Sequence, residues 1–129
     1  MIFINLPITD TQRSRKFYEV ALGCEILPEF SSSDTLCAKR DESTFFMLLE
    51  RARFAEFSPH PLGDPATSTC VLLALRLSSR AEVDDTFALA LKSGGSDAGK
   101  TQDFGDQMYS RSVHDPDGTV FELFFMKAD

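Results

Sequence analysis

The sequence predicts an α+β fold in which two βαβββ modules pair their sheets into an incomplete barrel around a cavity. Two observations favour this fold. The order of one strand, one helix and three strands is expected twice, and a proline-rich segment separates the two copies. Each copy exposes one sheet face, and pairing the two faces buries them. We therefore expect a single domain over residues 1–129, with module one at 1–51, a linker at 52–68 and module two at 69–129.

The first module begins with an alternating apolar segment, residues 2–8, which predicts a strand. Asp10 is placed to cap a helix that carries Phe17 and Ala21 on one face, and Gly23 is placed to end it. Polar turn segments then separate three further expected strands, at residues 25–30, 35–39 and 45–50.

The linker carries Pro59, Pro61 and Pro65, which the interior of a regular element does not tolerate. A faint internal match supports a duplication around it. AKRDESTFFMLLE can be laid on SVHDPDGTVFELF, and this alignment puts Leu48 where Glu122 stands.

The second module opens with an apolar run at residues 70–77, which predicts a strand. Ser79 and Glu82 have the spacing of a capping box, so a helix is expected to begin there and to end at Gly94. Extended segments are expected at residues 96–98, 107–113 and 119–126.

Composition excludes several partners. Thirteen basic and twenty acidic residues give a net charge of −7, and the basic residues are scattered, so nucleic acid and anionic membranes are not expected to bind. The apolar runs are far shorter than the roughly 20 residues of a membrane span, and we expect a cytoplasmic protein. Cys24, Cys37 and Cys70 are odd in number and widely spaced, which favours reduced thiols.

Three segments resemble the glyoxalase/bleomycin resistance/dioxygenase superfamily, also called the vicinal oxygen chelate fold. They are NLPITDTQRSRKFYEVALGCE (5–25), VLLALRL (71–77) and HDPDGTVFEL (114–123). The resemblance implies a small-molecule ligand, a homodimer and, as one possible chemistry, that of a lactoylglutathione lyase-like enzyme. Whether the modules pair within one chain or between two chains is left open.

The resemblance also implies a metal ion held by two histidines and a glutamate. The corresponding positions are Phe3 on the first strand, Leu72 on the first strand of module two, and Glu122 on the last strand. Leu48 occupies a position that supplies a further ligand in glyoxalase-type members. Phenyl and alkyl groups have no lone pairs to donate, so we expect no metal cofactor.

Two histidines lie outside these positions. His60 stands between two prolines, and His114 stands at the turn end of a strand, about eight residues from Glu122 along a hairpin. Both are expected to be surface residues, because a histidine outside a preorganised cluster rarely binds metal. A divalent-metal enzyme with such non-standard ligands remains an alternative.

Period-two alternation, together with the inward glutamate that the resemblance implies, predicts the cavity wall. This wall is apolar with a few polar points, which is typical of a small-molecule pocket. The predicted lining residues are Phe3, Asn5, Phe46, Leu48, Leu72, Ala74, Arg76, Met108, Ser110, Ser112 and Phe124. Tyr109 and Arg111 are expected to point away from the cavity, toward a subunit contact.

Glu122 is the candidate catalytic residue, and two functions are open. In one, the cavity binds or sequesters a small molecule without metal, and Glu122 fixes its orientation. In the other, the protein is a lyase or isomerase in which Glu122 acts as general base, with Asn5, Ser110 and Ser112 as hydrogen-bond donors. Glu122 as a remnant carboxylate in a nearly filled core is the structural alternative. No residue singles out a ligand.

Overall fold

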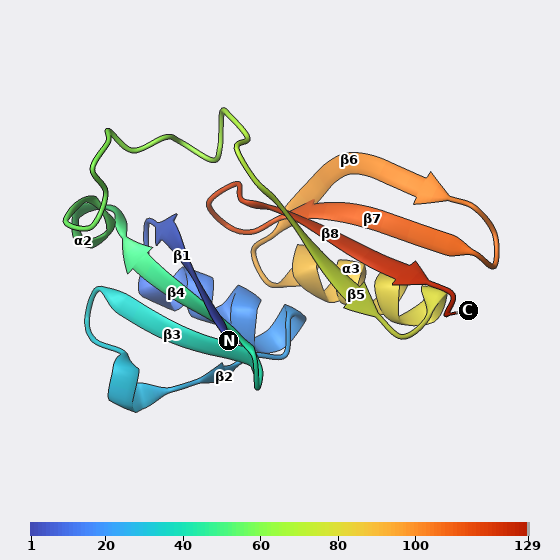
Figure 1. Ribbon diagram of the computed structural model, residues 1–129, viewed down its shortest axis with the longest axis horizontal. Helices are drawn as coiled ribbons and strands as arrows, with labels where there is room; N and C mark the ends of the chain where they lie inside the picture. Colours follow the sequence, from blue (N-terminus) through green and yellow to red (C-terminus); the bar gives the residue numbers. More distant parts are fainter. Residues whose placement is uncertain (129) are drawn as a thin grey trace. The chain divides into compact units, whose positions relative to one another are not determined.

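The computed structural model describes residues 1–128. The chain divides into two compact units, Met1–Asp64 and Pro65–Asp129, which we call the N-terminal and C-terminal units. Each unit contains one open four-stranded sheet and its own helices (Figure 1). The predicted α+β class with two βαβββ modules is confirmed. The pairing of the two sheets around a cavity stays a prediction.

The sheet of the N-terminal unit has the strand order β1-β4-β3-β2. β1 (Ile2–Ile8) runs parallel to β4 (Thr44–Glu50), and β3 (Thr35–Asp41) is antiparallel to β4. β2 (Glu25–Ile26) forms the other edge. The parallel pairing requires a crossover, which the helical segment between β1 and β2 provides.

β2 is shorter than the predicted strand at residues 25–30. After Leu27 donates its backbone N–H to the carbonyl of Cys37, the chain turns into a short 3₁₀ helix, η2 (Pro28–Phe30). Pro28 is the physical reason, because proline has no N–H to continue the ladder.

The crossover of the N-terminal unit consists of α1 (Thr11–Lys16), which continues directly as a π-turn, η1 (Phe17–Ala21). Asp10 caps α1 as predicted, since its carboxylate accepts hydrogen bonds from the N–H groups of Gln12 and Arg13 at 2.8 and 3.3 Å. Gly23 follows with φ of 66°, the left-handed conformation that ends a helix at glycine.

Apolar packing holds this crossover on one face of the sheet. Phe17 and Tyr18 are fully buried, and the Tyr18 ring lies 5.4 Å from the ring of Phe46 in β4. A further short helix, α2 (Arg51–Ala55), follows β4 and lies at the start of the predicted linker. No helix within residues 1–128 is both long and apolar enough to cross a membrane.

The sheet of the C-terminal unit has the equivalent order β5-β8-β7-β6. β5 (Leu72–Leu77) is parallel to β8 (Val120–Met126), and β7 (Met108–His114) is antiparallel to β8. β6 (Ser96–Asp103) is longer than predicted and contains a register shift between Asp97 and Thr101. This bulge explains why only its first residues read as a strand.

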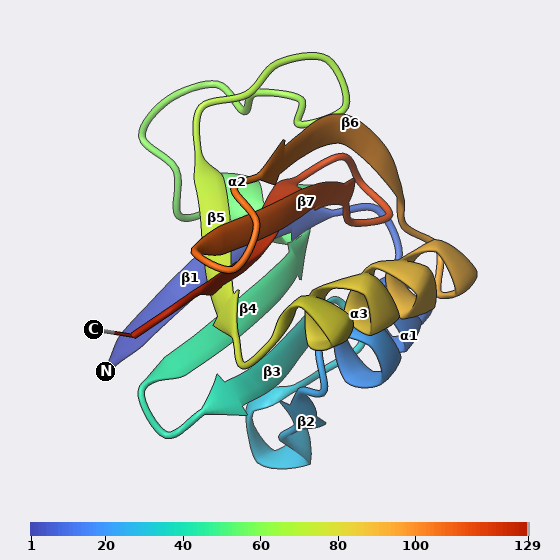
Figure 2. The same ribbon diagram turned by 90° about the vertical axis from the view of Figure 1, so that its right-hand side faces the viewer.

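The crossover helix of the C-terminal unit is α3 (Arg80–Lys92), which lies along one face of its own sheet (Figure 2). Ser79 caps it as predicted, since its hydroxyl accepts from the N–H of Glu82 at 3.0 Å. The Glu82 carboxylate reaches one residue beyond the N-cap and accepts from the N–H of Ser78 at 3.0 Å. Val83 and Phe87 bury the helix against the sheet.

The turn before β8 fixes where that strand starts. The buried Asp115 carboxylate accepts hydrogen bonds from the N–H groups of Asp117 and Thr119 at 2.9 and 3.0 Å. Gly118 has φ of 104°, and a Cβ there would lie 2.7 Å from the backbone of Ala66. Only glycine fits this position, because both its conformation and its space exclude a side chain.

Candidate functional site

Each sheet has one face covered by its own helix, and we call the opposite face its open face. The open face of the N-terminal unit carries a hollow of about 610 Å³, which we call the aromatic hollow. Its lining residues are Met1, Phe3, Glu25, Leu27, Glu29, Phe30, Cys37, Lys39, Phe45 and Met47. A volume of this size is that of a small-molecule pocket.

Strand register builds the floor of the aromatic hollow. Phe3 and Phe45 are cross-strand partners, and their rings stack with centroids 4.6 Å apart and an interplanar angle of 12°. The next row along the same strands is Asn5, Met47 and Cys37. These rows share one face because side chains two residues apart on a strand point the same way.

A second hollow of about 520 Å³ adjoins the first and shares Glu29, Phe30 and Met47 with it. It extends past Asn5 toward Phe57, which is 64% exposed. Phe3 and Asn5 therefore both lie on the open face. The two hollows adjoin, and polar side chains, among them Asn5, Ser31 and Arg53, line the second one.

The charged groups at the aromatic hollow are Glu25, Glu29, Lys39 and the α-ammonium of Met1. Lys39 donates to the Glu42 carboxylate at 2.9 Å, and this hydrogen bond raises the pKa of the Lys39 ammonium. Glu25 lies opposite Lys39 on β2. No hydrogen bond or ion pair to another residue in 1–128 engages the Glu29 carboxylate. Together with Glu42, these groups carry a net charge of −1.

Two of the three cysteines are buried. Cys24 and Cys37 are buried, and Cys70 is exposed; all three are free thiols. Burial raises the pKa of the Cys24 thiol to about 12 and also raises the pKa of the Cys37 thiol. Cys37 therefore contributes a neutral surface to the aromatic hollow.

Phe46 and Leu48 do not lie on the open face, and their prediction as lining residues was wrong. Both are fully buried on the helix side of β4, where Phe46 meets Tyr18. Glu50, on the same side, accepts a hydrogen bond from the N–H of Thr11 at 3.3 Å.

A one-residue slip in the internal alignment caused this error. The alignment matched Asp41 with Asp115 and so passed over the register shift between Lys39 and Asp41. The observed partners are Lys39 with Phe45 in one sheet and His114 with Val120 in the other. By these pairs Met47, not Leu48, is the counterpart of Glu122, and a slip of one residue moves every side chain to the other face.

Glu122 lies on the open face of the C-terminal unit and is half-buried. Its cross-strand partners are Ala74 on β5 and Ser112 on β7. Phe121 and Leu123, its neighbours along the strand, are fully buried on the other side of the sheet. By the same register, the predicted residues on this open face are Leu72, Ala74, Arg76, Met108, Ser110, Ser112 and Phe124.

Ser112, one of the donors expected to hold the Glu122 carboxylate, is engaged elsewhere, and so is Arg76. Ser112 donates its hydroxyl proton to the carbonyl of Lys100 at 2.9 Å, and Lys100 lies in the bulge of β6. Arg76 donates to the carbonyl of Met126 at 2.8 Å. Within residues 1–128 no hydrogen bond or ion pair engages the Glu122 carboxylate, which leaves its oxygens available to an external donor.

His114 lies closer to Glu122 than its separation in sequence indicates. β7 pairs it with Val120, two residues before Glu122, on the same open face. Its Nδ1 lies 3.0 Å from the Ser96 hydroxyl. The pairing of the two strands makes His114 and Glu122 diagonal neighbours on one face, and such neighbours lie about 7–8 Å apart. Their separation along the chain does not reveal this pairing. His60 lies in the exposed linker, where its carbonyl accepts a hydrogen bond from Ser58.

Of the positions that correspond to family metal ligands, only Glu122 carries a group that binds a divalent ion. Phe3 is stacked on Phe45, Leu72 presents an alkyl group, and the counterpart of Glu122 in the N-terminal unit is the thioether of Met47. None of these groups is a ligand for a hard or borderline divalent cation. Among residues 1–128 no cluster of three His, Cys, Asp or Glu side chains has the arrangement of a metal site.

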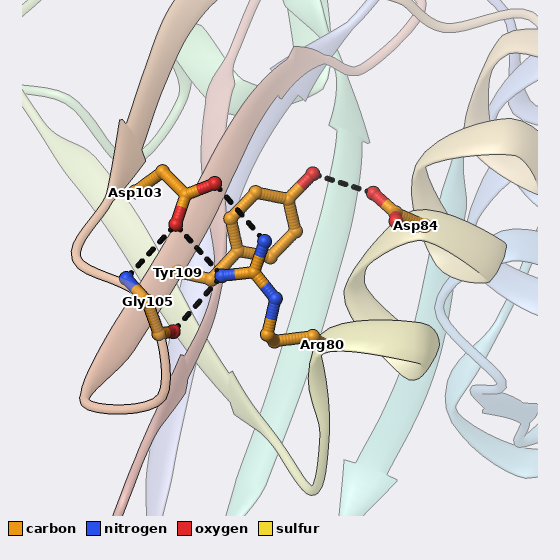
Figure 3. A network of polar contacts seen from close by, with 5 residues as sticks. All are labelled: Arg80, Asp84, Asp103, Gly105 and Tyr109. Atoms are coloured by element: carbon orange, nitrogen blue, oxygen red, sulfur yellow. Dashed lines mark hydrogen bonds and ion pairs between the residues drawn. The ribbon is translucent and has the colours of Figure 1, made fainter.

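A polar network lies on the helix side of the C-terminal unit (Figure 3). Arg80, at the start of α3, binds both oxygens of Asp103 at 2.8 and 3.0 Å and the carbonyl of Gly105 at 3.0 Å. Its guanidinium also lies 4.1 Å from the centre of the Tyr109 ring. The Tyr109 hydroxyl in turn donates to Asp84 at 2.6 Å.

This network joins α3 to the β6–β7 hairpin and leaves the open face free. The hydrogen bonds from Arg80 lower the pKa of Asp103, and the bond to Asp84 raises the pKa of Tyr109. Arg111 also turns to α3, with its guanidinium 3.5 Å from the centre of the Phe87 ring. Tyr109 and Arg111 point away from the open face, as predicted, and their place in a subunit contact stays a prediction.

Comparison with known proteins agrees with this architecture. The family model of the Glyoxalase/Bleomycin resistance protein/Dioxygenase superfamily matches residues 2–123. No curated protein matches the chain.

Solved structures share the fold at low sequence identity. A hypothetical protein from S. aureus is 23% identical with a TM-score of 0.79, over 97% of this chain and 92% of that one. A glyoxalase-related enzyme from Fulvimarina pelagi is 18% identical with a TM-score of 0.82, over 97% and 86%. The fosfomycin resistance protein FosX from Listeria monocytogenes is 18% identical with a TM-score of 0.71, over 98% and 93%.

Proposed function

The chain belongs to the Glyoxalase/Bleomycin resistance protein/Dioxygenase superfamily, and from this membership we propose that it binds or sequesters a small molecule without a metal ion. The aromatic hollow is the observation that carries the proposal. Its size lies within the roughly 300–1,000 Å³ of ligand pockets, and apolar side chains dominate its lining. Such a surface binds by burying apolar area of the ligand.

Binding is tested by titrating purified protein with a panel of apolar small molecules and following thermal stability and heat of binding. Met47→Gln places an amide in the floor of the hollow. It should lower the affinity for each ligand found by about tenfold or more, because the amide loses its hydration when the ligand covers it. Leu91→Gln makes a similar change on the exposed side of α3 and should leave affinity unchanged. If Met47→Gln and Leu91→Gln bind each ligand with the same affinity, the ligand does not bind in the aromatic hollow.

Metal independence is supported by the donor chemistry at Phe3 and Leu72. Elemental analysis of the purified protein should find less than stoichiometric zinc, nickel, manganese or iron. Dialysis against a chelator should leave both ligand affinity and melting temperature unchanged. A stoichiometric metal whose removal abolishes binding would contradict the proposal and favour a divalent-metal enzyme with non-standard ligands.

A second candidate function is that of a lyase or isomerase in which Glu122 acts as general base. The free carboxylate on the open face of the C-terminal unit favours it, since a base must be able to reach the proton that it removes. For any substrate found, Glu122→Gln should abolish turnover and keep substrate affinity. Binding without turnover in both forms would leave the protein a binding module.

We further propose a homodimer located in the cytoplasm and without nucleic-acid partners. The unpaired edges of the two sheets support self-association, and the net charge of −7 disfavours polyanions. Sedimentation should give twice the chain mass of 14.4 kDa. A single-chain mass at micromolar concentration would contradict the dimer.

A further inference from the structure

The aromatic hollow has features that select among small molecules. We propose that its ligand is a planar aromatic cation, an inference that rests on the proposed binding function and names the class of ligand. Three observations carry it: a stacked pair of rings, an apolar wall that lines the same hollow, and an excess of carboxylates over ammonium groups.

The stacked pair provides a platform for a flat ring. The Phe3 and Phe45 rings are nearly parallel, with 12° between their planes. Phe45 lies in the interior strand β4, whereas Phe3 lies on the edge strand β1 and is 48% exposed. An aromatic ligand gains more from such rings than an aliphatic one, because offset stacking and edge contacts add to the burial of area.

The apolar wall comes from the segment that the shortened β2 releases. Leu27 and Phe30 line the hollow together with the two stacked rings, and Phe30 is 61% exposed. The 3₁₀ helix η2 holds Phe30, since the N–H of Phe30 donates to the carbonyl of Leu27 at 3.2 Å. A hollow of about 610 Å³ with apolar sides accommodates two or three fused rings.

The charged side chains around the hollow favour a ligand of positive charge. Glu29 has no hydrogen-bonding or ion-pairing partner within residues 1–128, and Glu25 shares Lys39 with Glu42. Two ammonium groups, those of Lys39 and of the Met1 N-terminus, therefore face three carboxylates, and this local charge of −1 has the same sign as the −7 of the whole chain. A cationic ring gains attraction from the carboxylates and from the ring faces, whereas an anionic ring is repelled.

The experiment compares two probes with the same ring system. 9-Aminoacridine is a cation at pH 7 and acridine-9-carboxylate is an anion, and the fluorescence of each reports binding to the intact chain. The cation should bind at least about tenfold more tightly than the anion. Added salt should weaken binding of the cation, because the carboxylates are exposed to solvent.

Matched variants separate the ring platform from the charge. The double variant Glu25→Gln/Glu29→Gln should bind the cation about threefold to tenfold more weakly. Its affinities for the two probes should therefore lie closer together. Glu19→Gln, on the helix side of the same unit, should change neither affinity. Phe3→Leu keeps an apolar side chain but removes a ring, and it should weaken the binding of both probes by about threefold to tenfold.

The outcomes distinguish this inference from the function on which it rests. Equal affinity for the two probes, or a cation preference that survives the double glutamine variant, overturns the cation class and leaves binding in place. Tight binding of aliphatic ligands with no effect of Phe3→Leu overturns the planar class. If neither acridine nor any apolar ligand binds, the proposed function fails as well.

Discussion

The open faces of the two units have the same strand order and opposite surface chemistry. In the N-terminal unit the central row is Asn5, Met47 and Cys37, and an apolar hollow lies over it. In the C-terminal unit the equivalent row is Ala74, Glu122 and Ser112. The backbone topology is therefore common to both units, and the side chains on one face of three strands determine which unit offers an apolar surface.

The helix sides differ as well. The N-terminal unit holds a six-residue helix and a π-turn by burial of Phe17 and Tyr18. The C-terminal unit holds the 13-residue α3 by burial of Phe87 and also by polar contacts from Arg80 and Tyr109. A short crossover depends on large aromatic side chains, whereas a longer helix reaches the hairpin and adds directional bonds to it.

The largest expected effect tests whether the two faces of β4 differ. Phe46→Ala removes a ring with no exposed surface from the contact with Tyr18 and should lower the free energy of unfolding by about 3–5 kcal/mol. Urea denaturation measures it. Phe45→Ala, one residue away on the open face, should cost less and should weaken ligand binding instead. The contrast between the faces fails if Phe45→Ala costs more stability than Phe46→Ala.

The next effect concerns Gly118 in the turn before β8, since the equivalent turn of the N-terminal unit, residues 41–44, contains no glycine. Gly118→Ala combines a positive φ with a Cβ 2.7 Å from the backbone of Ala66, and should lower the free energy of unfolding by about 1–3 kcal/mol. Gly63→Ala, where an added Cβ meets nothing within 4 Å, is the control and should be near neutral. Similar unfolding curves for the two variants would argue against the close approach.

A smaller, pH-dependent effect tests the polar network. Tyr109→Phe removes the hydrogen bond to Asp84 and should lower the free energy of unfolding at pH 7 by about 1 kcal/mol. Because that bond raises the folded pKa of Tyr109, its contribution is fully present below the unfolded pKa of about 10 and is lost as pH rises through the folded pKa. Denaturation of both forms from pH 7 to 11 should show the difference shrinking. A constant difference would contradict the role of the hydroxyl.

The smallest effect concerns Glu122. Since no residue in 1–128 hydrogen-bonds its carboxylate, Glu122→Gln should change the free energy of unfolding by less than about 0.5 kcal/mol. Asp115→Asn alters a buried carboxylate with two N–H donors and should cost more. A large loss of stability in Glu122→Gln would support the remnant carboxylate held by the fold.

Much of the fold could be predicted from local signals. Asp10, Ser79 and Gly23 act at the helix ends as predicted, because caps depend on residues a few positions apart. The end of β2 was missed, although Pro28 signals it. The length of β6 was missed because a bulge interrupts its alternation.

The candidate site was predicted in part. Phe3, Asn5 and the C-terminal residues from Leu72 to Phe124 fall on the expected faces within their own units. Phe46 and Leu48 do not, and the engagement of Ser112 by Lys100 had no signal in the sequence. Whether these faces form one cavity stays a prediction.

By itself the sequence determined the repeated strand and helix order, the caps, the negative charge and the family. These properties follow from periodicity, from short-range spacing and from composition. Only the tertiary structure decided which side of β4 faces the hollow, that His114 lies near Glu122 and that Arg80 and Tyr109 meet. The physical reason is strand register: a shift of one residue leaves local geometry nearly unchanged and exchanges the two faces of a strand.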